Sequence, residues 1–233
     1  MSNSTLGALA VALGSAAALT GIVVTALGLA GRRAGWWREA RWLVWTMAAM
    51  ALVAIVVMER ALITRDFTVQ FVADHGSTRT PPVFNIATLW SALEGSILLW
   101  TFVLTGYVLA VVVKFRDRRD DPMLGWALLT LFVVSSVFFM YMLGPSNQYG
   151  TFDPPARYDG PGPNPLLQSH VLMAFHPPVL DLGYVGFTVP FAFAIGGLAT
   201  GRVGEGWLLA TRRWTVIAWG FLTTGIVLGA WWC

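Results

Sequence analysis

Two of the chain's three histidines, His170 and His176, lie where a proline-rich loop gives way to a long apolar run. Pro177 and Pro178 follow His176 directly. Proline is unsuited to a helix interior but suits a first helical turn, so we expect a helix to begin at or just after His176. The partial positive charge at a helix N-terminus favours the neutral imidazole that a metal requires. Two interpretations of His176 remain open at this point, a metal ligand and an interfacial histidine with an ordinary hydrogen bond.

The remaining reactive residues add no second site. His170 precedes His176 by six positions, about 240° on an ideal helix, so the two would not share a helical face. We interpret His170 as a loop or interfacial residue, and no motif surrounds His75. The single cysteine, Cys233, is the last residue, which argues against a disulfide framework or a cysteine-based metal site. We find no phosphate-binding loop, nucleophile elbow or paired-carboxylate motif.

The composition predicts an all-α polytopic membrane protein. Of the 233 residues, 56% are hydrophobic and only 12% are charged, which is far too apolar for a soluble domain of this size. The first apolar run lacks the basic start of a signal peptide and is long enough to span a bilayer, so we expect it to be retained. We predict one membrane domain, residues 1–233, with six transmembrane helices at about 6–30, 42–58, 88–113, 123–143, 178–199 and 214–232, and irregular loops at 63–85 and 144–175.

The basic residues are unevenly divided between the two sides of this arrangement. Of the 15 lysines and arginines, 11 fall on one side and 4, namely Arg60, Arg65, Arg79 and Arg157, fall on the other. The positive-inside rule then places both termini and both long loops on the outer side of the membrane. The basic residues are scattered between apolar runs, so they indicate topology and membrane lipid as a partner, and nucleic acid is excluded.

Several other residues have both a functional and a structural interpretation. Glu94 could orient a ligand, but Trp90 and Trp100 bracket it as an interfacial aromatic belt would. Gly183 and Gly186 favour close helix packing. Trp231 and Trp232 are ordinary belt residues on composition alone.

Three stretches resemble the CcmF-type cytochrome c haem lyases. They are "DFTVQFVA" with "ATLWSALEGSILLW", then "NPLLQSHVLMAFHPPVLDLGYVGFTVPFAFAI", and "RRWTVIAWGFLTTGIVLGAWW". The resemblance implies that His176 is an axial ligand of haem iron, with Pro177, Pro178, Trp90, Glu94, Trp231 and Trp232 as possible support. It further implies that the protein positions haem for thioether attachment to apocytochrome c, with a haem chaperone and other cytochrome c maturation subunits as partners.

The sequence departs from this family pattern at three places. Leu93 stands where relatives often have His, and Asp181 stands where Tyr is usual after His-Pro-Pro. The chain also ends at Cys233, before the tryptophan-rich segment of the family, as a truncated protein or one part of a split protein would. A transporter or a structural subunit of a larger membrane complex is the alternative, and paired charges or broken helices near the bilayer midplane would favour the transporter.

Overall fold

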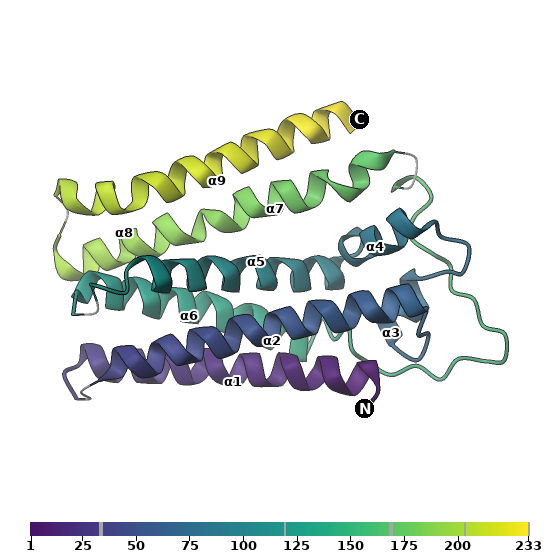
Figure 1. The fold of residues 1–233 in the computed structure, drawn as a ribbon, viewed down its shortest axis with the longest axis horizontal. Helices are drawn as coiled ribbons and strands as arrows, with labels where there is room; N and C mark the ends of the chain where they lie inside the picture. Colours follow the sequence, from purple (N-terminus) through teal and green to yellow (C-terminus); the bar gives the residue numbers. More distant parts are fainter. Residues whose placement is uncertain (33–34, 119, 168–169, 203, 233) are drawn as a thin grey trace.

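The computed structural model describes residues 1–32, 35–118, 120–167, 170–202 and 204–232, which form a bundle of long helices (Figure 1). Six segments of this described part are long and apolar enough to cross a membrane, as the composition predicts. Cys233 lies outside the described residues. The helices are α1 (Asn3–Leu29), α2 (Trp36–Thr64), α3 (Gln70–His75), α4 (Pro82–Ser91), α5 (Leu93–Lys114), α6 (Pro122–Leu143), the 3-10 helix η2 (Val171–Ala174), α7 (His176–Gly186), α8 (Thr188–Thr200) and α9 (Glu205–Trp232).

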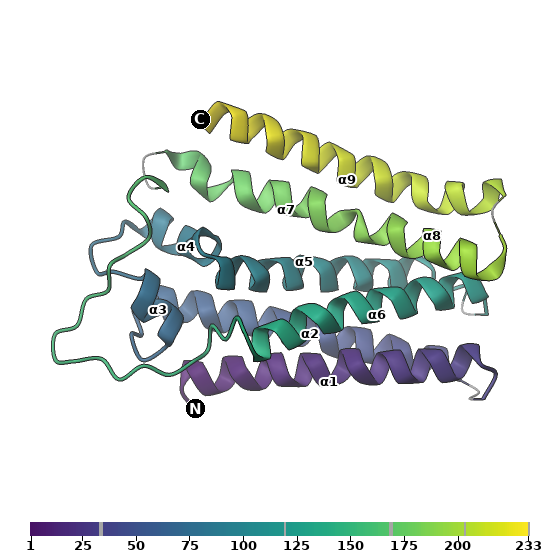
Figure 2. The same cartoon turned by 180° about the vertical axis from the view of Figure 1, so that it is seen from behind.

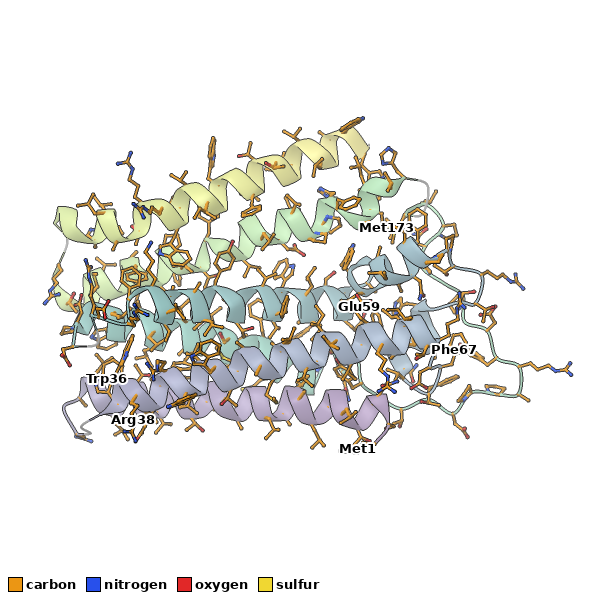
Figure 3. All side chains as sticks on the ribbon, in the orientation of Figure 1. Met1, Trp36, Arg38, Glu59, Phe67 and Met173 are labelled. Carbon is orange, nitrogen blue, oxygen red and sulfur yellow. The ribbon has the colours of Figure 1, made fainter. Side chains whose placement is uncertain are left out.

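The two ends of the bundle differ in what they carry. The N-terminus, the end of α9, α3, α4 and the start of α7 lie at one end, which we call the histidine end (Figure 1). The connections from α1 to α2, α5 to α6 and α8 to α9 lie at the opposite end, which we call the basic end because Arg38, Lys114 and Arg118 belong to it. Figure 3 shows the same division, with Trp36 and Arg38 at the basic end and Phe67 and Met173 at the histidine end.

Helix α1 packs through regularly spaced small residues. It contacts α2 and α6, which the view from behind shows beside it (Figure 2). Gly14 and Gly21 lie so close to the rings of Phe139 and Phe132 of α6 that a side chain at either glycine would collide with its ring. The small residues of the first apolar run therefore serve close helix contact, as their type predicts.

Both predicted boundaries of the second membrane helix, 42 and 58, are wrong, because α2 extends beyond its apolar centre at each end. The helix begins at Trp36 and continues through Thr64, so Glu59 and Arg60 lie inside it. Buried Leu62 keeps the last turn in the core, and its carbonyl accepts a 2.8 Å hydrogen bond from the Asn85 side chain. The region 63–85, predicted to be irregular, also contains α3 and the start of α4.

Two predicted single helices are interrupted. The predicted helix 88–113 is broken at Ala92, whose backbone is extended and which separates α4 from α5. The Ser96 hydroxyl donates to the Trp90 carbonyl, 3.1 Å away, and so replaces a lost backbone partner at the break. The predicted helix 178–199 is divided into α7 and α8 at Phe187. Pro190 lacks the N–H that would bond to the Gly186 carbonyl in a continuous helix.

The proline-rich loop is mostly extended or turned, as predicted, and it is pinned to the loop before α4. An isolated antiparallel bridge joins Val69 to Thr151. The Tyr158 hydroxyl donates to the Ala73 carbonyl at 3.0 Å. The Asp159 carboxylate accepts two hydrogen bonds of 2.8 Å from Thr78, one from the backbone and one from the hydroxyl. The two loops therefore form one layer over the histidine end.

Candidate functional site

His176 is the first residue of α7, and Pro177 and Pro178 occupy its first turn, which confirms the predicted helix start. The short helix η2 leads into this turn, and Phe175 lies between the two helices. The His176 side chain is half-buried at the histidine end.

The His176 ring is oriented by a backbone carbonyl of α9. Its Nδ1 lies 2.8 Å from the Gly225 carbonyl oxygen. A carbonyl oxygen only accepts hydrogen bonds, so Nδ1 carries the hydrogen and the neutral ring has its lone pair on Nε2. Histidines that bind metals typically donate their other ring N–H to a carbonyl or carboxylate in this way. The residue therefore has the hydrogen bonding typical of a histidine that binds a metal through Nε2.

Three glycines bring α7 and α9 close enough to form this site. A Cβ on Gly225 would lie 2.6 Å from the Cα of Leu180, and a Cβ on Gly183 would collide with the backbone of Leu222. A Cβ on Gly229 would lie 2.6 Å from Cε1 of His176 and 3.2 Å from its Nε2. The imidazole thus occupies space that any larger residue at position 229 would fill. Gly183 has the packing role that its type predicts.

The two predicted tryptophans at the end of α9 differ in their surroundings. The Trp232 ring lies edge-on to His176, with ring centroids 5.8 Å apart and planes at 64°. Trp231 is 74% exposed. Consecutive helical residues point about 100° apart, so only one of the pair can face α7. Trp232 is therefore the member that packs beside His176.

Trp90 and Glu94 lie on either side of the break at Ala92. The Trp90 indole N–H donates to the Met173 carbonyl at 2.9 Å and so holds η2, three residues before His176, against α4. Glu94 lies half-buried in the first turn of α5 and forms no hydrogen bond or ion pair among the described contacts. Trp90 acts here through positioning, and the structure does not bring Glu94 into contact with His176.

Asp181 is a buried carboxylate that the sequence alone marks only as a departure from the family pattern. It is 7% exposed, hydrogen-bonds the Trp100 side chain and lies near enough to His176 to interact electrostatically. The Trp100 ring also packs on Tyr184, with centroids 5.5 Å apart. Trp100 is therefore a contact between α5 and α7 and not merely a belt residue. A lone carboxylate inside an apolar span is the sequence signal that could have identified Asp181 as part of the site.

The other two histidines differ from each other in their hydrogen bonding. His170 caps η2, and its Nδ1 accepts the backbone N–H of Leu172 at 3.1 Å. Its neutral ring therefore carries the hydrogen on Nε2 and has no free lone pair there. On α3, the Nδ1 of His75 lies 3.2 Å from the Phe71 carbonyl oxygen, so its hydrogen bonding resembles that of His176, but its ring packs against the Phe71 ring of the same helix. Within the described chain, no group of three or more His, Cys, Asp or Glu residues could hold a metal ion.

Sequence reasoning missed Gly95, which shapes the approach to the site. A Cβ on Gly95 would collide with the Leu89 carbonyl oxygen, so only glycine permits α5 to begin this close to α4. The glycine between Glu94 and Ser96 was visible, but nothing local shows that Leu89 folds back onto it.

The fold and this site define a polytopic helical membrane protein with a half-buried imidazole at one end of the bundle. Residues 90–233 match the model of the family described as cytochrome C assembly protein. Because this match covers more than half of the chain, the chain belongs to the cytochrome C assembly protein family.

Individual relatives agree with this assignment. The cytochrome c-type biogenesis protein CcmF of Pseudomonas aeruginosa is 38% identical over 230 residues, which cover 97% of this chain and 34% of the relative. The protein of the same name from Escherichia coli K12 is 38% identical over 226 residues, again 97% and 34% of the two chains. A solved structure described as cytochrome c haem lyase CcmF superposes with a TM-score of 0.84 at 35% identity, covering 100% of this chain and 36% of that one. The chain thus spans about a third of the length of these relatives.

Proposed function

We propose that this chain forms the haem-receiving part of a cytochrome c haem lyase, with haem bound as substrate through His176. The observation that carries the proposal is the orientation of the ring. Gly225 accepts the Nδ1 hydrogen, which leaves Nε2 as the ligand atom beside Trp232. The relatives' names and the similar haem lyase structure support the same function.

The bound haem would supply the reactive vinyl groups, and the apocytochrome c would supply the thiols. In thioether formation each thiol adds across a vinyl group, so that a C–S bond and a C–H bond form while the S–H bond and the C=C π bond are lost. This chain's own residues would bind and orient the haem. His176 fixes one face of the haem, Trp232 limits the tilt of the imidazole, and Trp90 and Trp100 hold the flanking elements in place.

The proposed setting is the bacterial inner membrane, with the histidine end and both termini in the periplasm. A haem chaperone would deliver the substrate there, and apocytochrome c and further maturation subunits would meet the same face. The excess of basic residues at the opposite end supports this orientation.

A second candidate, a transporter, has one observation in its favour, the break between α7 and α8 inside a membrane span.

The haem lyase and the transporter differ in their need for His176. In cells that produce the full-length protein, His176→Ala should reduce haem-stained c-type cytochromes at least tenfold while membrane protein abundance stays normal. The matched control, His75→Ala, should leave maturation unchanged. Normal maturation in the His176→Ala cells would contradict the haem lyase assignment.

A further inference from the structure

A hollow of about 580 Å³ at the basic end collects four cationic side chains. Lys114 and Arg118 line it from the end of α5 and the turn that follows, and Arg212 and Arg213 line it from α9. Phe115, Leu209 and Ala210 complete its lining. None of these four cations forms an ion pair within the described part of the chain, and no acidic residue appears among the lining residues. The hollow therefore concentrates uncompensated positive charge.

Two of these cations lie within a membrane span. Arg212 and Arg213 fall inside the apolar segment Trp207–Trp232, and exposed Leu209 and Val216 lie on either side of them along α9. A charged side chain at this depth is costly unless it reaches the interface or finds a counter-charge. The position predicts an anionic partner at the level of the lipid headgroups.

Two of the four cations lie over aromatic rings. The Lys114 Nζ lies 5.6 Å from the centroid of the Trp214 ring, and the Arg118 guanidinium lies 5.8 Å from the centroid of the Phe115 ring. Such contacts restrict long side chains before a ligand arrives, which lowers the entropy cost of binding.

An apolar groove continues from the hollow along the outer face of α9. Its volume is about 510 Å³, and Leu208, Thr211, Thr215 and Val216 line it together with Leu209 and Arg212, which it shares with the hollow. A phosphate bound by the cations would thus have a hydrocarbon-lined path beside it. This combination distinguishes a phospholipid from a free anion.

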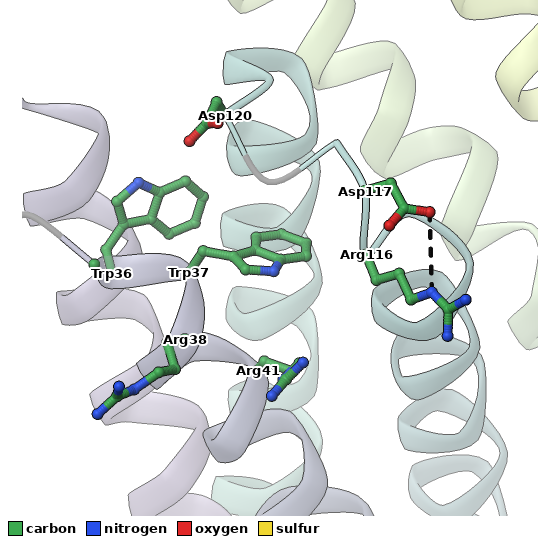
Figure 4. A pocket seen from close by; sticks show the side chains of 8 residues that line it. Trp36, Trp37, Arg38, Arg41, Arg116, Asp117 and Asp120 are labelled. Carbon is green, nitrogen blue, oxygen red and sulfur yellow. Dashed lines mark ion pairs between the residues drawn. The ribbon is translucent and has the colours of Figure 1, made fainter.

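The other basic hollow at this end lacks that charge imbalance. It is lined by Arg38, Arg41 and Arg116 but also by Asp117 and Asp120, and Arg116 pairs with Asp117 at 3.9 Å (Figure 4). Part of its positive charge is therefore balanced by the protein itself.

We propose that the hollow between α5 and α9 binds the headgroup of an anionic phospholipid, with an acyl chain in the adjoining groove. Four cations match a headgroup with two phosphates, so cardiolipin is the preferred ligand over a lipid with one phosphate. Basic pockets between membrane helices are known to favour such headgroups.

Titration of the full detergent-solubilised protein, followed by native mass spectrometry, tests the proposal. Cardiolipin should bind at least tenfold more tightly than phosphatidylcholine, and inorganic phosphate should not displace it. Replacing Arg212→Gln together with Arg213→Gln should weaken cardiolipin binding at least tenfold. The matched pair Arg38→Gln with Arg41→Gln removes the same charge at the same end and should change binding less than twofold.

Equal weakening by both variant pairs would overturn the proposal in favour of general surface attraction, and displacement by inorganic phosphate would overturn it in favour of a simple anion site. A second measurement uses the unaltered protein, so it does not depend on the folding of a variant. Cardiolipin with a photoreactive acyl chain should crosslink to residues 208–216. Crosslinks spread evenly over the exposed helices would contradict the site.

Discussion

At His176, the hydrogen bond to Gly225 decides what the ring can do. Because Nδ1 donates to a carbonyl, Nε2 is left as the basic nitrogen. His170 shows the opposite arrangement, since its Nδ1 accepts an amide hydrogen. Two histidines of one short segment therefore differ in chemistry because of their hydrogen-bond partners, and of these two it is His176 that presents a free lone pair on Nε2.

Trp90 offers a test of positioning at the scale of a single hydrogen bond. Trp90→Phe keeps a ring but removes the donor to the Met173 carbonyl, at an expected cost of about 1 kcal/mol in the free energy of unfolding. Cytochrome maturation should decrease but not be abolished, because η2 would no longer hold the start of α7 in one place. The same change at Trp219, which is 61% exposed, is the control and should leave maturation and thermal stability unaltered.

The hydrogen bonds to the Asp159 carboxylate determine how the contact between the proline-rich loop and the loop before α4 should respond to acid. The pKa of Asp159 lies below its ordinary value of 3.8, first because the Thr78 backbone N–H donates to the carboxylate and next because the Thr78 hydroxyl does so. The nearby charge of Arg79 lowers this pKa further. A group with a lowered pKa contributes stability above its unfolded value and loses it as the pH falls through the folded value. The contact between the loops should therefore persist at neutral pH and down to about pH 4, and open in stronger acid.

Hydrogen exchange at the Thr78 amide, corrected for the intrinsic effect of pH, measures that opening. Protection in the unaltered protein should be lost only below about pH 4. Asp159→Asn should weaken protection already at neutral pH and remove its acid dependence. Equal protection in both proteins at every pH would contradict the role given to this carboxylate.

At the scale of elements, the contact between α7 and α9 depends on glycines that admit a neighbouring backbone. Gly225→Ala would place a Cβ 2.6 Å from the Leu180 Cα, so the helices would have to move apart. We expect a loss of about 1–3 kcal/mol in stability and a weaker bond to His176. Thermal unfolding in detergent measures the first effect, and haem binding measures the second.

Gly220→Ala is the matched control on the same helix. No atom lies within 4 Å of a Cβ built at Gly220, so alanine should be neutral or slightly stabilising there, because glycine costs about 1 kcal/mol in a helix interior. A similar loss of stability in both variants would show that α9 is sensitive to alanine in general, and would argue against a specific contact between backbones.

At the scale of the whole molecule, the separation of the two ends predicts orientation. Single cysteines introduced at Arg157 in the proline-rich loop and at Arg118 at the basic end, in a protein whose Cys233 is replaced by serine, should react differently with a thiol reagent that cannot cross the membrane. Intact spheroplasts should label position 157 and leave position 118 protected. The reverse pattern would contradict the periplasmic placement of the histidine end and with it the proposed encounter with apocytochrome c.

The sequence by itself determined the features that depend on a short stretch of chain and its solvent. Six apolar runs specified six membrane segments, because each such helix satisfies its own backbone hydrogen bonds. Pro177 and Pro178 specified a helix start at His176, because proline restricts the backbone locally. The resemblance to the haem lyases likewise rested on contiguous motifs, and the family assignment confirmed it.

Only the tertiary structure decided which groups meet. The partner of His176 is the carbonyl of Gly225, 49 positions away, and a backbone carbonyl has no sequence signature. The hydrogen bond between Asp181 and Trp100, and the close contact between Gly95 and Leu89 at the break at Ala92, likewise depend on how elements pack. Side-chain type and local periodicity can be read from the sequence directly. The distance between two helices depends instead on which small residues face each other across their contact, and that is decided only when the helices pack.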